Sequence, residues 1–433
     1  MLDINLIRAK PEEVGAALLK RMPQIDFSGF LAWDSERRAL IARADELKAR
    51  RNRVSAEIPA MKKQGQNTDD LITEMKVVAG RIKELDKARG EFDSRIRAFM
   101  ALLPNVPDED VPAGGKENNE VLHTWGQKPT HAFAAEDHMA LVSRLNLVDY
   151  ERGAKLGGNG YWVYSGQGAV LEWALINYFI EQRRADGYEF LLLPHILNDS
   201  CGYTAGQFPK FREDVFLVSQ MGGASSQRGS SGSEHFLLPT SETALASFHA
   251  DKILLEEDLP KKYFSFTPCY RREAGSYRTG ERGMIRGHQF NKVEMFQYTL
   301  PEDSDAALEE LLDRAERLVR DLGLHYRVSK LAAGDCSAAA AKTYDVEVWI
   351  PSMDDFKEVS SVSNARDYQA RRGNIRVKRK ATGRNEYLHT LNASALATSR
   401  LFPALCEQMQ QADGSVSVPP VLQRWTGFSK IEV

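Results

Sequence analysis

A dense run of arginines and glutamates marks the stretch CYRREAGSYRTGERGMIRGHQFNKVEMF, residues 269–296. Side chains two apart on a strand point to the same face, so Arg271 and Glu273 are predicted to be neighbours while Arg272 points away. A fixed cation beside a fixed carboxylate suits a ligand with an anionic part and an amine part, such as phosphate and a purine amino group. The spacing therefore suggests recognition of a nucleotide.

The segment GHQFNKVEMF alternates again after Arg286, which predicts that His288, Phe290, Lys292 and Glu294 face one way on a returning strand. An aromatic ring on a polar face offers a stacking platform for a base, and a carboxylate can hold a small amine or hydroxyl. The same charges would also fit a surface hairpin with cross-strand salt bridges, each worth less than about 1 kcal/mol. The charge pattern alone does not separate the two interpretations.

The composition is that of a globular protein with two or three domains, because 433 residues exceed one ordinary core. The chain is 42% hydrophobic and 27% charged with a net charge of −3, which excludes a uniformly basic nucleic-acid-binding surface. The four cysteines lie far apart without a C-x-x-C pair, which argues against a zinc cluster or a disulfide framework. No signal peptide or membrane-spanning window is recognised, so we expect a cytoplasmic protein with no membrane partner.

A heptad pattern between Phe30 and Leu103 predicts two long helices. The connection KKQGQNTDD offers Gly65 as a helix stop and Asn67 or Thr68 as the next N-cap, and it is short enough only for an antiparallel turn. Helices of about thirty residues would project on the order of 50 Å as a coiled-coil arm. The first helix carries a basic stripe, which could bind nucleic acid or could be the solvated face that any coiled coil needs. Its members are Arg37, Arg38, Arg43, Lys48, Arg50, Arg51, Arg53, Lys62 and Lys63.

The region after Leu103 begins with a linker, PNVPDEDVPAGGKENNE, whose prolines and glycines forbid further helix. Beyond it, strand-like runs such as FLLLPHI, YFSFTPCY, DVEVWI and LHTLNASALA outnumber strand-helix-strand alternations. This favours an α+β fold, with an antiparallel sheet flanked by helices. The usual glycine-rich phosphate motifs are absent, and residues 219–234 read as a serine-rich surface insertion.

Several long motifs resemble the seryl-tRNA synthetases, which are class II aminoacyl-tRNA synthetases, in that family's order. YRREAGS followed by ERGMIRGHQFNKVE resembles motif 2, and LLPTSET resembles the serine-binding T-x-E element. TYDVEVWIP, EVSSVSNARDYQARR and HTLNASALATSR resemble the C-terminal strands and motif 3. The resemblance covers essentially the whole chain. It implies an N-terminal tRNA-binding domain with a two-helix coiled-coil arm at 1–110 and a class II catalytic domain at 111–433.

The resemblance implies that Arg271 holds the ATP α-phosphate, Glu273 the adenine amino group, and Phe290 the ring. Arg271, Arg286 and Arg400 would act as the catalytic cations, and Mg²⁺ would be held by Glu358 and Ser361. The ATP-binding residues implied are Arg271, Arg272, Glu273, Arg286, Phe290, Glu358, Val359, Ser360, Ser361 and Arg400. Those implied for serine are Thr240, Ser241, Glu242, Arg271, Glu294, Asn392 and Ser394.

The implied reaction is activation of L-serine with ATP to seryl-adenylate, followed by transfer to tRNA(Ser). The family also charges tRNA(Sec) where that tRNA exists. A homodimer is implied through the helix at 170–185 and the following segment, with Pro194 near the dimer axis. Two alternatives stay open: a paralogue that binds tRNA without aminoacylation, and a ligase for another small amino acid or a carrier protein.

Three segments depart from the family's usual pattern. Ser241 replaces an alanine in the T-x-E element, and SYRTGERG replaces the commoner turn of motif 2, although Arg282 is kept in place. Ala393 and Ala395 replace two glycines of motif 3. If those positions required positive φ, each methyl group would cost about 1 kcal/mol.

Overall fold

The computed structural model describes residues 1–219, 234–273 and 283–432. Its contacts divide the chain into two compact units, which we call the arm unit (2–16 and 23–103) and the core unit (1, 17–22 and 104–433). Arg278, Glu281 and Arg282 of the motif 2 turn, and residues 220–233 of the serine-rich insertion, lie outside the described residues. Within the described residues, no helix is long and apolar enough to cross a membrane.

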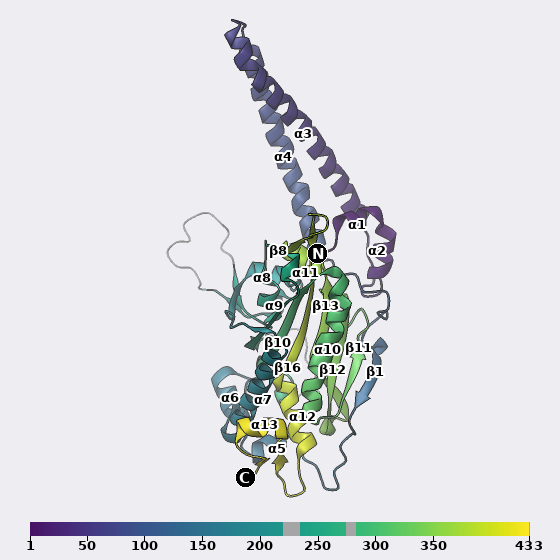
Figure 1. Cartoon of the computed structure of the whole chain (residues 1–433), viewed down its shortest axis with the longest axis vertical. Coiled ribbons are helices and arrows are strands. Elements are labelled where there is room, and N and C mark those ends of the chain that lie inside the picture. Colours follow the sequence, from purple (N-terminus) through teal and green to yellow (C-terminus); the bar gives the residue numbers. More distant parts are fainter. Residues whose placement is uncertain (220–233, 274–282, 433) are drawn as a thin grey trace. The chain divides into compact units, whose positions relative to one another are not determined.

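The arm unit is built on two long antiparallel helices, as the heptad pattern predicts (Figure 1). The helices are α3 (Ser28–Lys63) and α4 (Asp69–Leu102), and Gly65 in the turn between them has φ +75°. Met75, Val78 and Ile82 of α4 are buried in the predicted seam. Two short helices precede the pair, α1 (Ile4–Ala9) and α2 (Pro11–Leu18), of which α2 is divided between the two units.

Ion pairs join the two arm helices along their length. Arg37 contacts Asp93 at 3.2 Å and Lys48 contacts Asp86 at 3.4 Å, while nearer the turn Arg50 pairs with Glu74. Part of the predicted basic stripe therefore stabilises the hairpin itself. Four of its members are exposed and make no ion pair within the described residues: Arg43, Arg53, Lys62 and Lys63.

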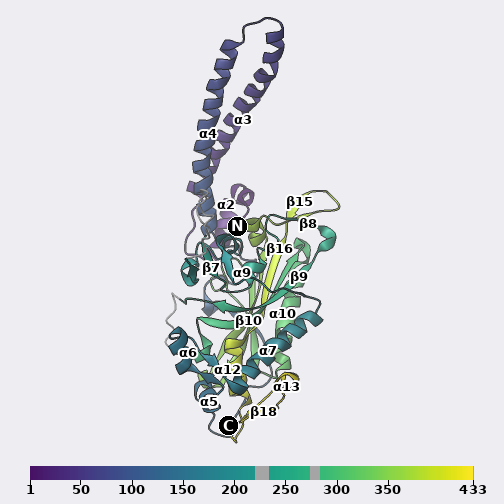
Figure 2. The same cartoon turned by 90° about the vertical axis from the view of Figure 1, so that its left-hand side faces the viewer.

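The core unit contains a mainly antiparallel sheet of eight strands within the described residues (Figure 2). Across the sheet the order is β1 (Glu120–Trp125), β11 (Tyr326–Lys330), β12 (Lys342–Ile350), β13 (Asp355–Arg366), β16 (His389–Ala397), β10 (Gln289–Thr299), β9 (Lys261–Tyr270) and β4 (Glu189–Phe190). Every pairing is antiparallel except the one between β4 and β9.

Strand alternation separates the two faces of this sheet. Val293 and Met295 of β10 belong to the main hydrophobic core, whereas Lys292 and Glu294 on the same strand line a cavity. The same division holds on β16 and β12, because a period of two sends successive side chains to opposite faces. On those strands Leu391, Ala393, Ala395, Tyr344, Val346 and Val348 pack in the core, and Asn392, Ser394, Thr343, Asp345 and Glu347 line the cavity.

Three helices pack against the core face of the sheet (Figure 1, Figure 2). They are α7 (Gly166–Ala185), α10 (Ser304–Asp321) and α12 (Thr398–Met409). The helix expected at 170–185 is present as the greater part of α7. The other helices of the core unit are α5 (His138–Arg144), α6 (Tyr150–Gly157), α8 (Asp199–Thr204), α9 (Glu242–Leu245), α11 (Tyr368–Gly373) and α13 (Pro420–Thr426).

Smaller sheets complete the core unit. Their strands are β2 (Val148–Asp149) with β3 (Val163–Tyr164), β5 (Ile196–Asn198) with β7 (His235–Leu237) and β6 (Leu217–Val218), β8 (Ile253–Leu255) with β14 (Arg376–Lys378) and β15 (Asn385–Tyr387), and β17 (Val416–Ser417) with β18 (Lys430–Ile431). The expectation of a strand over FLLLPHI is wrong for most of its length. Residues 191–195 between β4 and β5 have no regular structure.

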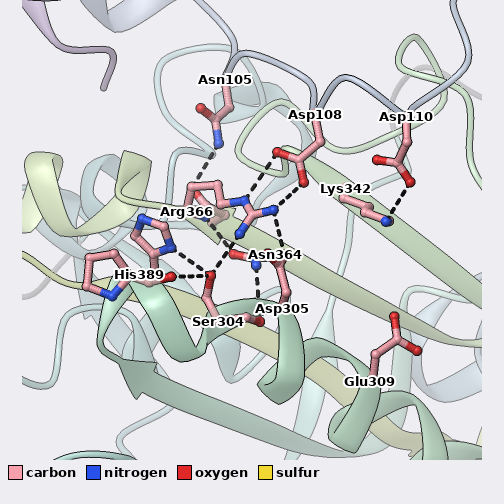
Figure 3. Close-up of polar contacts among 12 residues, drawn as sticks. Asn105, Asp108, Asp110, Ser304, Asp305, Glu309, Lys342, Asn364, Arg366 and His389 are labelled. Atoms are coloured by element: carbon pink, nitrogen blue, oxygen red, sulfur yellow. Dashed lines mark hydrogen bonds and ion pairs between the residues drawn. The ribbon is translucent and has the colours of Figure 1, made fainter.

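The linker after α4 is fixed to the ends of β13 and β16 by a polar cluster (Figure 3). Asp108 accepts from Arg366 at 2.6 Å, and Arg366 also donates to the hydroxyl of Ser304 at 2.8 Å. Buried Asn105 donates to the carbonyl oxygen of Ala365 at 2.8 Å. Arg366 has φ +49°, a conformation that its several partners help to hold. The linker, the end of β13 and the start of α10 are thereby held together.

Candidate active site

A cavity of about 680 Å³ opens on the polar face of the sheet. It brings together most of the side chains that the sequence singled out, although they come from distant segments. The predicted residues that line it are Thr240, Glu242, Arg271, Glu273, Arg286, Phe290, Glu294, Glu358, Ser361, Asn392, Ser394 and Arg400. The surface hairpin interpretation is therefore not favoured, because these charges converge on a concave site.

Four predicted site residues do not line the cavity. Arg272 donates to the carbonyl oxygen of Glu213 at 3.1 Å, which agrees with its predicted outward direction. Ser241 is fully buried beside the cavity, and Val359 packs in the main core. Ser360 is buried and donates to the carbonyl oxygen of Ser394 at 2.7 Å. Any contact of these residues with substrate stays a prediction.

Two details of the predicted strand geometry are wrong. β9 ends at Tyr270, so Arg271 and Glu273 lie just beyond the strand, and Glu273 has φ +51°. Both side chains still reach the cavity. His288 precedes β10, does not line the cavity, and has Nδ1 3.0 Å from the carbonyl oxygen of Arg271.

Two glutamates of the cavity, Glu242 and Glu294, interact with each other electrostatically. The Glu294 carboxylate accepts from Asn392 at 2.9 Å and from Ser394 at 3.3 Å. Lys292 contacts the same carboxylate at 2.5 Å and donates to the hydroxyl of Thr240 at 2.7 Å. Lys292 therefore offsets one of the two negative charges in a poorly hydrated site, a role that sequence reasoning left unassigned.

Glu242 lies in a different electrostatic environment. Burial raises its pKa to about 7, and the nearby charge of Glu294 acts in the same direction, whereas Lys292 lowers it. Its carboxylate is thus close to half ionised at neutral pH. An incoming ammonium group would favour the ionised form and would supply the missing positive charge.

Two of the cavity arginines are held in defined positions by neighbouring groups. Arg271 lies over the ring of Phe290, with 5.1 Å between Cζ and the ring centroid, and donates from Nε to the carbonyl oxygen of Pro239 at 3.2 Å. Arg286 forms an ion pair with Glu273, and its Nε donates to Glu273 Oε2 at 2.8 Å. The cations and the aromatic ring expected for a nucleotide are therefore adjacent.

Arg400, near the start of α12, donates to the Glu358 carboxylate at 3.1 Å and to the Glu358 carbonyl oxygen at 3.0 Å. Burial alone would raise the pKa of Glu358, but Arg400 and Arg271 more than offset it, so that its pKa lies below the usual value. Glu358 is therefore ionised at neutral pH.

Asp345 is a cavity residue that sequence reasoning missed. It lies opposite Ser361 across β12 and β13, and its carboxylate accepts from the Ser361 hydroxyl at 2.5 Å. Burial and the charge of Glu358 raise the pKa of Asp345 well above its usual value. Its strand alternates with the core residues Val346 and Val348, and that pattern is the signal that could have placed it on the polar face.

The oxygen atoms of Glu358 and Ser361 fit a magnesium ion. The Ser361 hydroxyl lies 3.4 Å from the Glu358 carboxylate within the cavity. Carboxylate and hydroxyl oxygens together with phosphate oxygens are the ligands that Mg²⁺ prefers. Within the described chain, no group of three or more His, Cys, Asp and Glu side chains is arranged to hold a metal ion alone. A Mg²⁺ ion at this position would complete its coordination with water or phosphate oxygen atoms.

The two alanines of motif 3 are compatible with the site. Neither Ala393 nor Ala395 has positive φ, so the expected backbone cost does not arise. Both are fully buried in the hydrophobic core and neither lines the cavity. The residue at positive φ in this segment is Leu396, with φ +95°.

Comparisons with known proteins identify the family of the chain. Residues 1–107 match the family described as "Seryl-tRNA synthetase N-terminal domain", and residues 226–409 match "tRNA synthetase class II core domain (G, H, P, S and T)". The chain is 57% identical over 432 residues to "Serine--tRNA ligase 2" of Clostridium acetobutylicum, and the match covers 100% of both chains. The chain belongs to the seryl-tRNA synthetase family.

Solved seryl-tRNA synthetases share the fold over the whole chain. The enzyme from Pyrococcus horikoshii, complexed with ATP, matches with a TM-score of 0.87 at 32% identity and covers 100% of this chain and 99% of its own. The cytoplasmic serine–tRNA ligase of Naegleria fowleri, in complex with AMP, gives a TM-score of 0.85 at 26% identity, with coverage of 100% and 99%. The predicted fold class and family are confirmed.

Proposed function

We propose that this seryl-tRNA synthetase activates L-serine with ATP and transfers the seryl group to tRNA(Ser). One observation carries the assignment: a single cavity holds an arginine set, an aromatic ring and two glutamates in a chain of this family. The arginines and ring suit a nucleotide, and the glutamates suit an amino acid with a small hydroxyl. A paralogue without aminoacylation is less favoured, because both halves of the site are complete.

The serine subsite is formed around Glu242 and Glu294. Glu242 would receive the substrate ammonium, and Glu294, held by Asn392 and Ser394, would accept from the serine hydroxyl. Thr240 completes this wall, Ser241 lies directly behind it, and Arg271 would contact the carboxylate. Alanine would leave buried polar groups unpaired, so it should be rejected strongly.

The ATP subsite would use Arg271 on the α-phosphate, with Arg286 and Arg400 on the outer phosphates. Phe290 would stack on adenine, and Glu273 would accept from its amino group. The backbone near Arg272, Val359 and Ser360 would complete the subsite. Glu358 and Ser361 would hold Mg²⁺, which when bound neutralises charge on phosphate oxygens.

The first step is in-line attack of the serine carboxylate on the α-phosphorus, with pyrophosphate as leaving group. A carboxylate at neutral pH needs no general base, so the arginines act by positioning the reactants and stabilising charge on the phosphorus. In the second step the terminal ribose hydroxyl of the tRNA attacks the carbonyl carbon of seryl-adenylate, and AMP leaves.

The arm supplies tRNA recognition in this proposal. Arg43, Arg53, Lys62 and Lys63 are exposed on α3 and have no carboxylate partner among the described residues, so they are free to contact phosphates. tRNA(Sec) is proposed as a second substrate where it exists. We place the tRNA-binding domain at 1–110 and the catalytic domain at 111–433, and we place the protein in the cytoplasm, where tRNA is charged.

A homodimer is proposed through α7 and the segment around β4. Trp173 is 55% exposed and Leu192 is 78% exposed, and Val170 and Phe190 are exposed beside them on these segments. Trp173 also packs against Phe266 of β9, with 5.8 Å between ring centroids. Exposed apolar residues gathered on neighbouring elements are typical of a protein interface.

The test measures serine-dependent ATP–pyrophosphate exchange and tRNA aminoacylation with the wild type, Arg271→Ala and an arm-deleted form. We expect Arg271→Ala to lose both activities, and the arm deletion to keep exchange and lose charging. Arg314→Ala serves as the control, because Arg314 pairs with Asp186 on the opposite side of the sheet, away from the cavity. Exchange that is faster with glycine or alanine than with serine would refute the serine assignment.

A further inference from the structure

Glu242 receives one hydrogen bond on its carboxylate within the described residues, and the donor lies outside the cavity. Gln369 of α11 donates from Nε2 to Glu242 Oε1 at 2.9 Å. The Gln369 side chain is 1% exposed and does not line the cavity. Oε1 of Glu242 is thus bonded to a residue outside the cavity. Oε2 has no hydrogen-bond partner in the described part of the chain.

The orientation of the Gln369 amide is fixed by its other partners. Thr390 of β16 donates from its hydroxyl to Gln369 Oε1 at 2.8 Å, and Gln369 Nε2 also donates to the carbonyl oxygen of Ala205 at 3.1 Å. A flipped amide would set its oxygen against the Glu242 carboxylate and the Ala205 carbonyl group. Two oxygen–oxygen contacts would then replace two hydrogen bonds, so the observed orientation is strongly favoured.

We propose that Gln369 is a positioning residue for serine binding: held by Thr390 and Ala205, it fixes the Glu242 carboxylate so that its second oxygen can receive the substrate ammonium. This inference rests on the proposed function, in which Glu242 belongs to the serine subsite. Glu294, by contrast, is held by residues that themselves line the cavity, Lys292, Asn392 and Ser394.

The Gln369 hydrogen bond should also affect the ionisation of Glu242. Burial and Glu294 raise the pKa of Glu242, and Lys292, the Gln369 hydrogen bond and Arg271 lower it. Removing the Gln369 amide takes away one of the groups that favour the ionised carboxylate. Serine affinity at neutral pH should therefore fall and should recover partly as the pH is raised.

The test compares pyrophosphate exchange in full-length wild type, Gln369→Met and Thr390→Val. Gln369→Met keeps the volume of the side chain and removes its donor and acceptor. We expect KM for serine to rise about tenfold, since a buried hydrogen bond to a charged group is lost, while KM for ATP changes less than twofold. The pH at which kcat/KM for serine is half-maximal should move upward. Thr390→Val should give the same changes to a smaller extent, and Thr390→Ser should restore wild-type behaviour.

Gln408→Met is the matched control. Gln408 is also a buried glutamine, and its Nε2 donates to the carbonyl oxygen of Trp349 at 2.8 Å, yet it does not line the cavity or contact a residue of the serine subsite. It should lower thermal stability as Gln369→Met does, without a selective rise in KM for serine. An equal rise in both variants would overturn the proposal, because general loosening of the fold would explain it.

Glu242→Gln separates this inference from the proposed function. If Glu242→Gln raises KM for serine while Gln369→Met changes it less than twofold at every pH, the positioning role is refuted and the serine subsite stands. If Glu242→Gln leaves KM for serine unchanged, the subsite assignment itself is wrong, and the role of Gln369 is refuted with it.

Discussion

Glu172 of α7 is a buried carboxyl group that joins this helix to β10 and α12. Its titration should make the stability of the core unit depend on pH. Glu172 is 4% exposed, and its Oε1 accepts from Asn291 of β10 at 2.8 Å and from Thr398 of α12 at 2.6 Å. Its other oxygen is buried and has no hydrogen-bond partner within the described residues. Burial accordingly raises its pKa from 4.5 to about 7. The perturbation is Glu172→Gln, which keeps an acceptor and removes the titration.

The raised pKa of Glu172 determines whether stability rises or falls with pH. The folded state holds the proton more tightly than the unfolded state, so the stability contributed by Glu172 is complete below pH 4.5 and is lost as the pH rises toward 7. With these two pKa values, the linkage relation gives a loss of about 2 to 3 kcal/mol between pH 5 and pH 8. Glu172→Gln does not titrate, so its stability relative to wild type should increase by that amount over the interval.

The assay is urea unfolding followed by tryptophan fluorescence at the two pH values. Every tryptophan except Trp33 lies in the core unit, so the signal reports that unit. Other titrating groups cancel in the difference between variant and wild type. Thr398→Val is the control: it keeps the carboxylate and removes one donor, so its pH-dependent loss should be at least that of wild type. A difference between Glu172→Gln and wild type that is constant with pH would refute the reasoning.

Three further outcomes are expected. In pyrophosphate exchange, kcat/KM for serine should rise about tenfold from pH 6 to pH 8, because a Glu242 pKa of about 7 leaves the carboxyl group protonated on the acidic side; the same value at both pH values would contradict the role of Glu242. The double variant Arg43→Glu and Arg53→Glu should lower kcat/KM for tRNA at least tenfold and leave exchange unchanged, and a loss of slope in the salt dependence of binding would identify lost phosphate contacts. The double variant Trp173→Glu and Leu192→Glu should sediment as a monomer if these exposed residues form the dimer interface, and an unchanged sedimentation coefficient would place the interface elsewhere.

Strand alternation made much of the site predictable. Once β10 is recognised, Phe290 and Glu294 must share a face, and the apolar Val293 and Met295 between and beside them must pack in the core. The arm was predictable for a similar reason, since a sustained heptad pattern and a short turn at Gly65 leave only an antiparallel hairpin.

The features that could not be predicted are the exact ends of strands and the tertiary contacts between distant segments. Glu273 reaches the cavity from a residue with φ +51° beyond the end of β9, and local alternation carries no information about such a departure. Gln369 contacts Glu242 across 127 positions of sequence, and Asp345 contacts Ser361 through strand pairing. These contacts are properties of the tertiary structure, so a single sequence does not reveal them.

The ion pair between Arg286 and Glu273 shows that a salt bridge and a ligand site can use the same side chains. In the structure the pair satisfies both side chains, as a surface salt bridge would. Both residues also line the cavity, and their side chains are 24% and 19% exposed, so water partly screens their attraction. An ion pair of this kind contributes on the order of 1 kcal/mol, which phosphate and adenine contacts can readily replace. The pair therefore holds each group close to its proposed ligand contact before ATP arrives, and ATP binding exchanges one set of charge-assisted bonds for another.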